Sequence, residues 1–225
     1  SVVATFCHQL ANNLEPQINT DSTLKLIYVD ELVGCMIDSM HQKNKSSIKE
    51  IDHTFLLKVS DLLFELSSIK NNYLGFGIIP NLENRLIKNL FNTLLTYINY
   101  DQFFPFNLKI NSDNRGSFVE TMKLNTGGQI SFSTTFPGVK RGEHFHTHKA
   151  ERFAVIKGKA KIEIRRIGKE KKYTFYLDGQ TPSFVDMPVW YTHNITNIGE
   201  EELYTLFWTN ELYDPKDPDT YYKAV

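Results

Sequence analysis

The chain has 225 residues, of which 41% are hydrophobic, and its formal net charge at pH 7 is -1. This length allows two small hydrophobic cores, and the near-neutral charge gives no reason to expect a nucleic-acid or membrane partner. No apolar run approaches the ~18 residues that a membrane-spanning helix needs. No signal peptide is visible, so we expect a cytoplasmic protein.

Helical periodicity dominates the first hundred residues. Helices are predicted over residues 1–13, 30–41, 59–69 and 81–97, and a strand over residues 25–29. Ser60 is expected to be the N-cap of the third helix, because its hydroxyl can accept from a free backbone amide.

Apolar residues at helical spacing mark the last of these helices. We assign them to core packing: Leu82, Leu86, Leu90, Leu94 and Ile98. The two cysteines, Cys7 and Cys35, fall in separate predicted helices and are expected to be free core thiols.

The pattern changes from helix to strand around Pro105, so a domain boundary is predicted at about residues 98–110. Beyond it, short runs of alternating or apolar residues are separated by glycine-containing turns, which is typical of a β-sandwich or barrel. The predicted strands cover residues 117–123, 128–136, 152–156, 159–167, 172–177, 181–186 and 202–208. The expected domains are therefore residues 1–100 and residues 101–225.

The most informative motif is His144-Phe-His146, followed by Glu151 and, in a later segment, by His193. Side chains alternate along a strand, so two histidines two residues apart point to the same face. Three imidazoles and one carboxylate suit Zn, Fe(II), Ni or Mn, whereas Ca and Mg prefer mostly oxygen ligands. Four ligands from two hairpins leave positions open for water or substrate, which favours a catalytic site.

The spacing of these residues resembles the two motifs of the cupin superfamily. The matching strings are Gly138-x5-His144-x-His146-x4-Glu151-x6-Gly158 and Pro188-x4-His193-x3-Asn197. One position departs from the pattern, since Trp190 stands where the second motif usually has glycine. The resemblance implies a jelly-roll barrel (a double-stranded β-helix) in which the three histidines and the glutamate bind a metal. A cupin without metal, or histidines that are merely exposed in another barrel, are the alternatives.

A second resemblance covers nearly the whole chain. Residues 1–100 resemble the C-terminal, substrate-binding part of an extended short-chain dehydrogenase/reductase, with Leu26-Ile-Tyr-Val-Asp30-Glu31-Leu-Val33 at that family's Val-Asp-Asp-Val segment. This region joined to a cupin, together with the tail Trp208–Tyr221, resembles the CapF-type enzymes of capsule synthesis. The expected fold class is therefore α+β, with a remnant of the reductase domain followed by an all-β cupin barrel.

The CapF resemblance implies a bifunctional nucleotide-sugar enzyme of capsule or O-antigen synthesis. In that family the cupin epimerises C3 of a UDP-4-keto-6-deoxy-N-acetylhexosamine, and the reductase domain then reduces C4 with NADPH on the route to UDP-N-acetyl-L-fucosamine. The resemblance also implies a UDP-sugar substrate and a homodimer formed through the cupin domain. It implies a bound divalent metal as well, for which zinc is the first expectation and iron, nickel or manganese are the alternatives.

The dinucleotide-binding half of a reductase has no counterpart in the sequence. The one Gly-x-Gly, Gly75-Phe-Gly77, lies in an aromatic loop ahead of Pro80, and no Tyr-x-x-x-Lys pair occurs. By resemblance, NADPH would bind only in the full-length protein, and we expect this chain alone to reduce nothing.

Four residues near the metal motif are candidate acids or bases: Lys149, Tyr191, Asp186 and His148. For Lys149 and His148, an exposed loop position without a chemical role is the alternative. Two other functions stay open on the sequence alone. One is a non-catalytic dimerisation module stiffened by a metal, and the other is an Fe(II) dioxygenase, for which the same ligands would serve.

Overall fold

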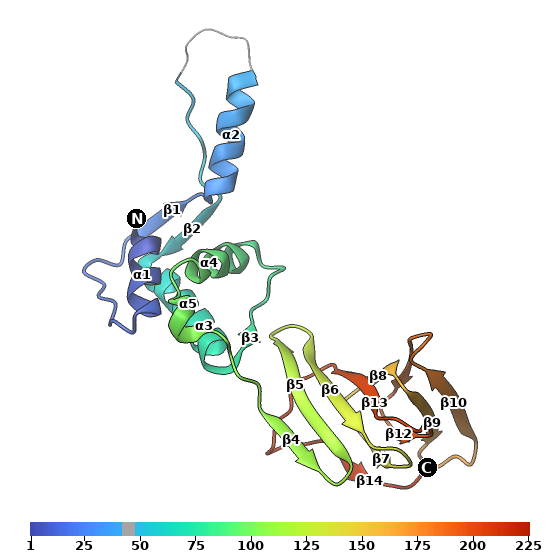
Figure 1. The fold of residues 1–225 in the computed structure, drawn as a ribbon. Coiled ribbons are helices and arrows are strands. Elements are labelled where there is room, and N and C mark those ends of the chain that lie inside the picture. Colours follow the sequence, from blue (N-terminus) through green and yellow to red (C-terminus); the bar gives the residue numbers. More distant parts are fainter. Residues whose placement is uncertain (42–47) are drawn as a thin grey trace. The chain divides into compact units, whose positions relative to one another are not determined.

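The computed structural model describes residues 1–41 and 48–225, which form two compact units (Figure 1). Unit 1 contains Ser1–Phe76 and Pro80–Pro105, and unit 2 contains Gly77–Ile79 and Phe106–Val225. No helix within the described residues is long and apolar enough to cross a membrane.

Unit 1 combines helices with a small antiparallel sheet. Its helices are α1 (Val2–Ala11), α2 (Val29–His41), α3 (Val59–Phe76), α4 (Arg85–Leu95) and α5 (Tyr100–Phe103). Its strands β1 (Thr23–Leu26) and β2 (Phe55–Lys58) pair so that Thr23 faces Lys58. The strand β2 was not predicted, because it is only four residues long and shows no distinctive alternation of polar and apolar residues.

One apolar core joins α1, α3 and α4. Its buried members are Phe6, Cys7, Leu10, Val59, Leu62, Leu66, Ile69, Leu90, Phe91 and Leu94. Burial raises the pKa of the Cys7 thiol to about 12. Cys35 is free as well but only partly buried, so the expectation of a core thiol is confirmed for Cys7 and wrong for Cys35.

Two helix starts differ from the prediction. Ser60 is not a cap, because α3 already begins at Val59, and the Ser60 amide and hydroxyl instead donate to the carboxylate of Asp21 at 2.8 and 3.0 Å. The helix predicted from residue 81 begins at Arg85, where the side chain of Asn84 accepts from two backbone amides. Leu82 therefore lies ahead of α4, outside its buried stripe.

Unit 2 consists of two sheets. One has the order β10-β9-β12-β7-β14, and the other has the order β11-β8-β13-β6-β5-β3, with β4 paired to β5 (Figure 1). All pairs are antiparallel except β3 with β5. The strands are β3 (Ile78–Ile79), β4 (Ile110–Asp113), β5 (Gly116–Leu124), β6 (Gly128–Thr135), β7 (Lys140–Phe145), β8 (Glu151–Lys157), β9 (Lys159–Arg166), β10 (Lys172–Asp178), β11 (Ser183–Met187), β12 (Tyr191–Asn197), β13 (Leu203–Thr209) and β14 (Tyr221–Tyr222).

The core of unit 2 lies between these two sheets. Residues from β8, β11 and β13 meet residues from β9, β10 and β12: Phe153, Val155, Met187 and Leu203 with Ala160, Ile162, Ile164, Leu177 and Ile195. The seven strands predicted beyond residue 110 are confirmed with shifts of one or two residues at their ends. No bounds were predicted for β7 and β12, which carry His144 and His193. The short strands β3, β4 and β14 were not predicted, because each owes its strand geometry to a partner distant in sequence.

Candidate metal centre

Four side chains of unit 2 converge on one point, and they are the predicted set His144, His146, Glu151 and His193. One potential ligand atom from each lies within 4.8 Å of the others. His144 belongs to β7 and His193 to β12 of one sheet, whereas Glu151 opens β8 of the facing sheet. The cluster therefore joins the two sheets of the barrel.

A β-bulge in β7 aims His144 at this point. The register pairs Asn194 with Gly142 but His193 with His144, so Glu143 is an extra residue with a φ of 68°. Without the extra residue, the alternation of a strand would turn His144 to the opposite face. Gly142 is required there, because a Cβ atom would lie 2.7 Å from the carbonyl oxygen of His193.

Backbone carbonyls fix the tautomers of two histidines. The Nδ1 atom of His146 donates to the carbonyl of Asp219, and Nδ1 of His193 donates to the carbonyl of Tyr191 at 3.1 Å. Because a carbonyl can only accept, Nδ1 carries the hydrogen and Nε2 keeps its lone pair. This arrangement is the one that metal-binding histidines adopt.

The atoms that face the centre of the cluster lack hydrogen-bond partners. Nε2 of His146 and Nε2 of His193 lie 3.2 and 3.0 Å from Oε2 of Glu151. All three atoms are buried, and none makes a hydrogen bond. Buried polar atoms without partners are costly, and a cation between them would satisfy all three. The residues thus fit a divalent metal ion.

The charge states of the cluster suit the same role. Burial, and secondarily the nearby His193, lowers the pKa of His144 to about 4, so this ring is neutral at pH 7. Burial alone would raise the pKa of Glu151, but the imidazoles of His146 and His193 beside its carboxylate outweigh burial and hold the pKa well below its usual range. For His146, burial is likewise outweighed by Glu151, and its pKa is raised. A metal ion would replace the proton that Glu151 attracts to His146.

Two of the four candidate acids or bases lie in the loop between the ligands. Lys149 is buried, and its Nζ donates to the carbonyl of Pro218 at 2.7 Å. His148 is exposed, and its Nδ1 lies 3.1 Å from a carboxylate oxygen of Glu211. The loop therefore turns Lys149 inward and His148 outward.

The other two candidates are engaged elsewhere. Asp186 pairs across the sheet with Arg152, whose guanidinium donates to both carboxylate oxygens at 2.7 and 2.9 Å. This pair points outward, because the neighbouring Met187 is buried in the core. Tyr191 packs against the core of unit 2 and meets the cluster through its carbonyl, which holds His193.

Trp190, at the position where the resembling motif usually has glycine, has a backbone conformation that favours glycine. Its φ is 63°, in the left-handed region, and its amide donates to the carbonyl of His146 at 2.7 Å. The indole stacks on Phe145 with ring centroids 5.7 Å apart, and Phe145 stacks in turn on Tyr221. The left-handed residue Trp190 thus carries a ring that packs on the outside of the metal loop, the segment between His146 and Glu151.

A second group of potential ligands consists of the exposed His148, the partly buried Glu211 and the buried Asp219. The carboxylate of Asp219 already accepts hydrogen bonds from three consecutive backbone amides. This group is therefore a structural contact between the loop and the C-terminal tail. No role for Asp219 was predicted from the sequence, because its residue type alone gives no sign of these bonds.

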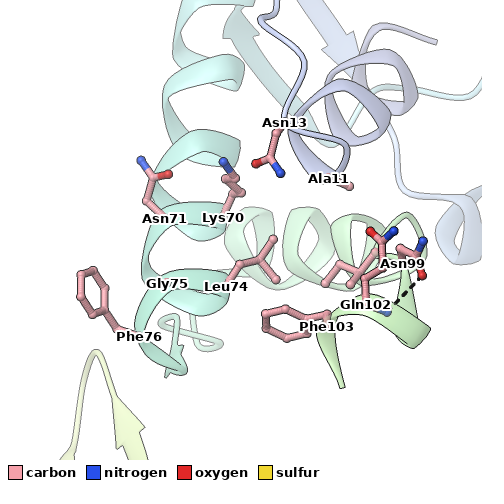
Figure 2. A pocket seen from close by; sticks show the side chains of 11 residues that line it. Ala11, Asn13, Lys70, Asn71, Leu74, Gly75, Phe76, Asn99, Gln102 and Phe103 are labelled. Atoms are coloured by element: carbon pink, nitrogen blue, oxygen red, sulfur yellow. Dashed lines mark hydrogen bonds between the residues drawn. The ribbon is translucent and has the colours of Figure 1, made fainter. Parts of the chain in front are cut away.

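Unit 1 has a cavity of its own, of about 620 Å³ (Figure 2). Lys70 of α3 and Asn13, which follows α1, line it together with carboxamides and apolar side chains, among them Asn99, Leu74 and Phe103. Its lining contains no histidine, cysteine or carboxylate, so it offers hydrogen bonds and one positive charge but no metal ligands.

Comparisons with known proteins agree with this architecture. Residues 111–221 match the family model of the polysaccharide biosynthesis C-terminal domain. The chain is 35% identical to the capsular polysaccharide assembling protein CapF of Staphylococcus aureus, with a TM-score of 0.83, over 100% of this chain and 61% of that one. The chain is a homologue of CapF. Its predicted class, α+β with a C-terminal cupin barrel, is confirmed.

Two further relatives extend the comparison. The chain is 33% identical to the UDP-2-acetamido-2,6-beta-L-arabino-hexul-4-ose reductase of Pseudomonas aeruginosa, over 100% of this chain and 60% of the relative. A crystal structure of CapF with the inhibitor 3-isopropenyl-tropolone matches at 35% identity and a TM-score of 0.83, over 100% of this chain and 66% of that one. The chain thus spans about 60% of the length of the Pseudomonas reductase and of the Staphylococcus CapF.

Proposed function

We propose that this CapF homologue is a nucleotide-sugar modifying enzyme of capsule or O-antigen synthesis whose cupin barrel performs metal-assisted epimerisation. The substrate is a UDP-4-keto-6-deoxy-N-acetylhexosamine, and the centre inverted is C3. The observation that carries the proposal is the set of buried, unpartnered atoms of His146, Glu151 and His193 around one point. The Pseudomonas relative is named for a 4-keto UDP-sugar, which matches this substrate class.

The proposed ion is zinc, with iron, nickel and manganese as the other ions that three imidazoles and one carboxylate would hold. Bound by His144, His146, Glu151 and His193, the ion would supply Lewis-acid stabilisation of charge on a carbonyl oxygen. The tropolone inhibitor of the CapF crystal structure fits this proposal, because adjacent carbonyl and hydroxyl oxygens are a chelating pair.

The chain's own residues supply the remaining parts of the reaction. A C3 proton next to the C4 ketone is acidic enough for a positioned side chain to remove it and return it on the other face. We assign a proton-carrying role to Lys149, which is buried beside the ligands and whose charge contributes to lowering the pKa of His144. Tyr191 orients His193. His148 and Asp186 are weaker candidates for an acid or base, because His148 is exposed and Asp186 is paired with Arg152.

Hydrogen exchange at the substrate tests this function. In heavy water, the wild-type chain should incorporate deuterium at C3 of the UDP-4-keto-6-deoxy sugar, measured by NMR or mass spectrometry. His144→Ala should slow the exchange by ~10²-fold or more, because a ligand is lost without removing the proposed base. His53→Ala, an exposed histidine of unit 1, is the matched control and should exchange like wild type. Undiminished exchange in His144→Ala would sink the proposal, and oxygen uptake on adding iron and substrate would favour a dioxygenase.

The reductive half-reaction belongs to a part of the enzyme outside this chain. We propose that NADPH binds there and reduces C4, since the chain spans about 60% of its reductase relative and carries no Gly-x-Gly-x-x-Gly string. The chain alone should therefore oxidise no NADPH in the presence of the 4-keto sugar. Substrate-dependent loss of NADPH absorbance with the purified chain would contradict this division.

We also propose that two copies pair through the outer face of the larger barrel sheet. Side chains in one row across this face are apolar: Phe184, Ala154, Leu206, Phe132, Val119 and Ile110. Such a row is typical of a protein interface. Leu206→Arg should convert a dimer to a monomer in analytical ultracentrifugation, whereas Tyr176→Arg on the outer face of the other sheet should not. Leu206 is 37% exposed and Tyr176 is 73% exposed, so the control is the more accessible of the two sites. A monomeric wild type would refute the pairing.

A further inference from the structure

The C-terminal tail holds the metal loop through one residue, Asp219. Its side chain is completely buried. The carboxylate accepts from the backbone amides of Thr147, His148 and Lys149 at 2.9, 2.9 and 2.8 Å. It also accepts from the hydroxyl of Thr147 at 2.6 Å. Three consecutive amides that converge on one carboxylate fix the path of the backbone directly after the ligand His146.

The same residue contacts a metal ligand directly. The peptide carbonyl of Asp219 accepts from Nδ1 of His146, which leaves Nε2 of that ring to face Glu151 and His193. Asp219 has a φ of 40°, in the left-handed region, and this local turn brings its carbonyl and its carboxylate to the same loop. One residue therefore sets both the tautomer of His146 and the conformation of the backbone that follows it.

Neighbouring residues of the tail reinforce this contact. We define the tail segment as residues 218–223. Pro218 accepts from Nζ of Lys149 at 2.7 Å, and the amide of Lys223 donates to the carbonyl of Glu143 at 2.9 Å. Between them, β14 pairs with β7 so that Tyr222 faces His144. The tail segment thus runs beside the chain from Glu143 to Lys149, which includes two of the four proposed ligands.

We propose that Asp219 is a positioning residue of the metal centre, so that docking of the tail segment and binding of the metal stabilise each other. The inference rests on the metal site of the proposed function. Residues behind a ligand histidine commonly alter metal affinity by ~10- to 100-fold, because they orient the ring. Coupling of this kind is reciprocal, so a metal that binds more tightly when the tail is docked must also hold the tail more tightly.

A cobalt titration tests the role of Asp219. The metal-free chain is titrated with Co²⁺ alone, whose visible absorption reports both affinity and coordination geometry. Asp219→Asn retains the size of the side chain but places an amide group against three backbone donors, and it should weaken cobalt binding by about 10- to 100-fold and alter the spectrum. Asp217→Asn is the same change two residues earlier on an exposed side chain, and it should stay within about 2-fold of wild type.

Amide hydrogen exchange supplies a readout that needs no variant. In the wild-type chain, saturating Co²⁺ should slow amide exchange in residues 219–223 as well as in the loop 147–149. This measurement decides the coupling even if Asp219→Asn fails to fold.

The outcomes separate this inference from the function on which it rests. If the wild-type chain binds no cobalt, the metal centre is refuted and the positioning role with it. If wild type binds cobalt but tail exchange is insensitive to the metal, or if a folded Asp219→Asn binds with unchanged affinity, the positioning role alone is overturned.

Discussion

The ligand histidines show how much of the centre is determined by single residues. The i, i+2 spacing of His144 and His146 was sufficient to predict a shared face, and the structure brings both to Glu151 and His193. The spacing could not show the β-bulge at Glu143, which turns His144 toward the other three residues of the cluster. It depends on how β7 lies against β12, and that pairing joins residues about fifty positions apart.

Asp219 illustrates the opposite case at the same scale. It contacts the loop across about seventy residues of sequence, and most of its partners are backbone amides, which every residue except proline carries. A local pattern cannot reveal such a contact. Lys149 was predicted as a candidate for its position beside the ligands, and the structure adds that its ammonium is turned toward Pro218.

Gly142 provides a test of the bulge geometry. Gly142→Ala places a Cβ atom against the backbone of His193, at a φ of 96°. Gly138→Ala is the matched control, with a φ of 74° but open space around its Cβ. The control should lose about 1 kcal/mol of unfolding free energy from backbone strain, and Gly142→Ala should lose on the order of 3 kcal/mol or more, with weaker metal binding. Denaturant unfolding measures both, and equal losses would contradict the close approach of β7 and β12.

At the scale of elements, α1 to α4 of unit 1 were predicted from periodicity, whereas their ends and the four-residue helix α5 were not. The stripe of leucines located α4, but the sequence alone gave equal weight to Leu82 and Leu94. Asn84 decides between them by capping the helix, so that Leu82 lies before the first turn. The barrel strands were easier to place, because alternation and glycine turns both mark them, whereas β2 needed the partner strand β1 to define it.

Leu94 and Leu82 test this reading of α4. Leu94 is fully buried in the core of unit 1, and Leu82 is 41% exposed. Leu94→Ala should lower the unfolding free energy of unit 1 by about 2–5 kcal/mol, the usual cost of a truncated core leucine. Leu82→Ala should cost less than about 1 kcal/mol. Comparable losses in urea titrations would show that the helix begins earlier than Arg85.

At the scale of the whole molecule, the chain brings together two units with different chemical capacities. Unit 2 holds the candidate metal-binding set, and unit 1 offers a cavity without metal ligands. The resemblance of residues 1–100 to the substrate-binding part of a reductase remains a prediction, and so does the boundary between the two domains. The chain is homologous to CapF along its full length and spans 61% of that protein.

The most direct test of the central claim is the metal dependence of C3 exchange in the wild-type chain. The protein is stripped with a chelator and then reloaded with zinc, manganese, nickel or iron, while deuterium incorporation into the UDP-4-keto-6-deoxy sugar and bound metal are measured on the same samples. The account predicts that exchange disappears with the metal and returns in proportion to the sites refilled. Exchange at an unchanged rate in the stripped protein, or no exchange at full occupancy with any of the four ions, would contradict it.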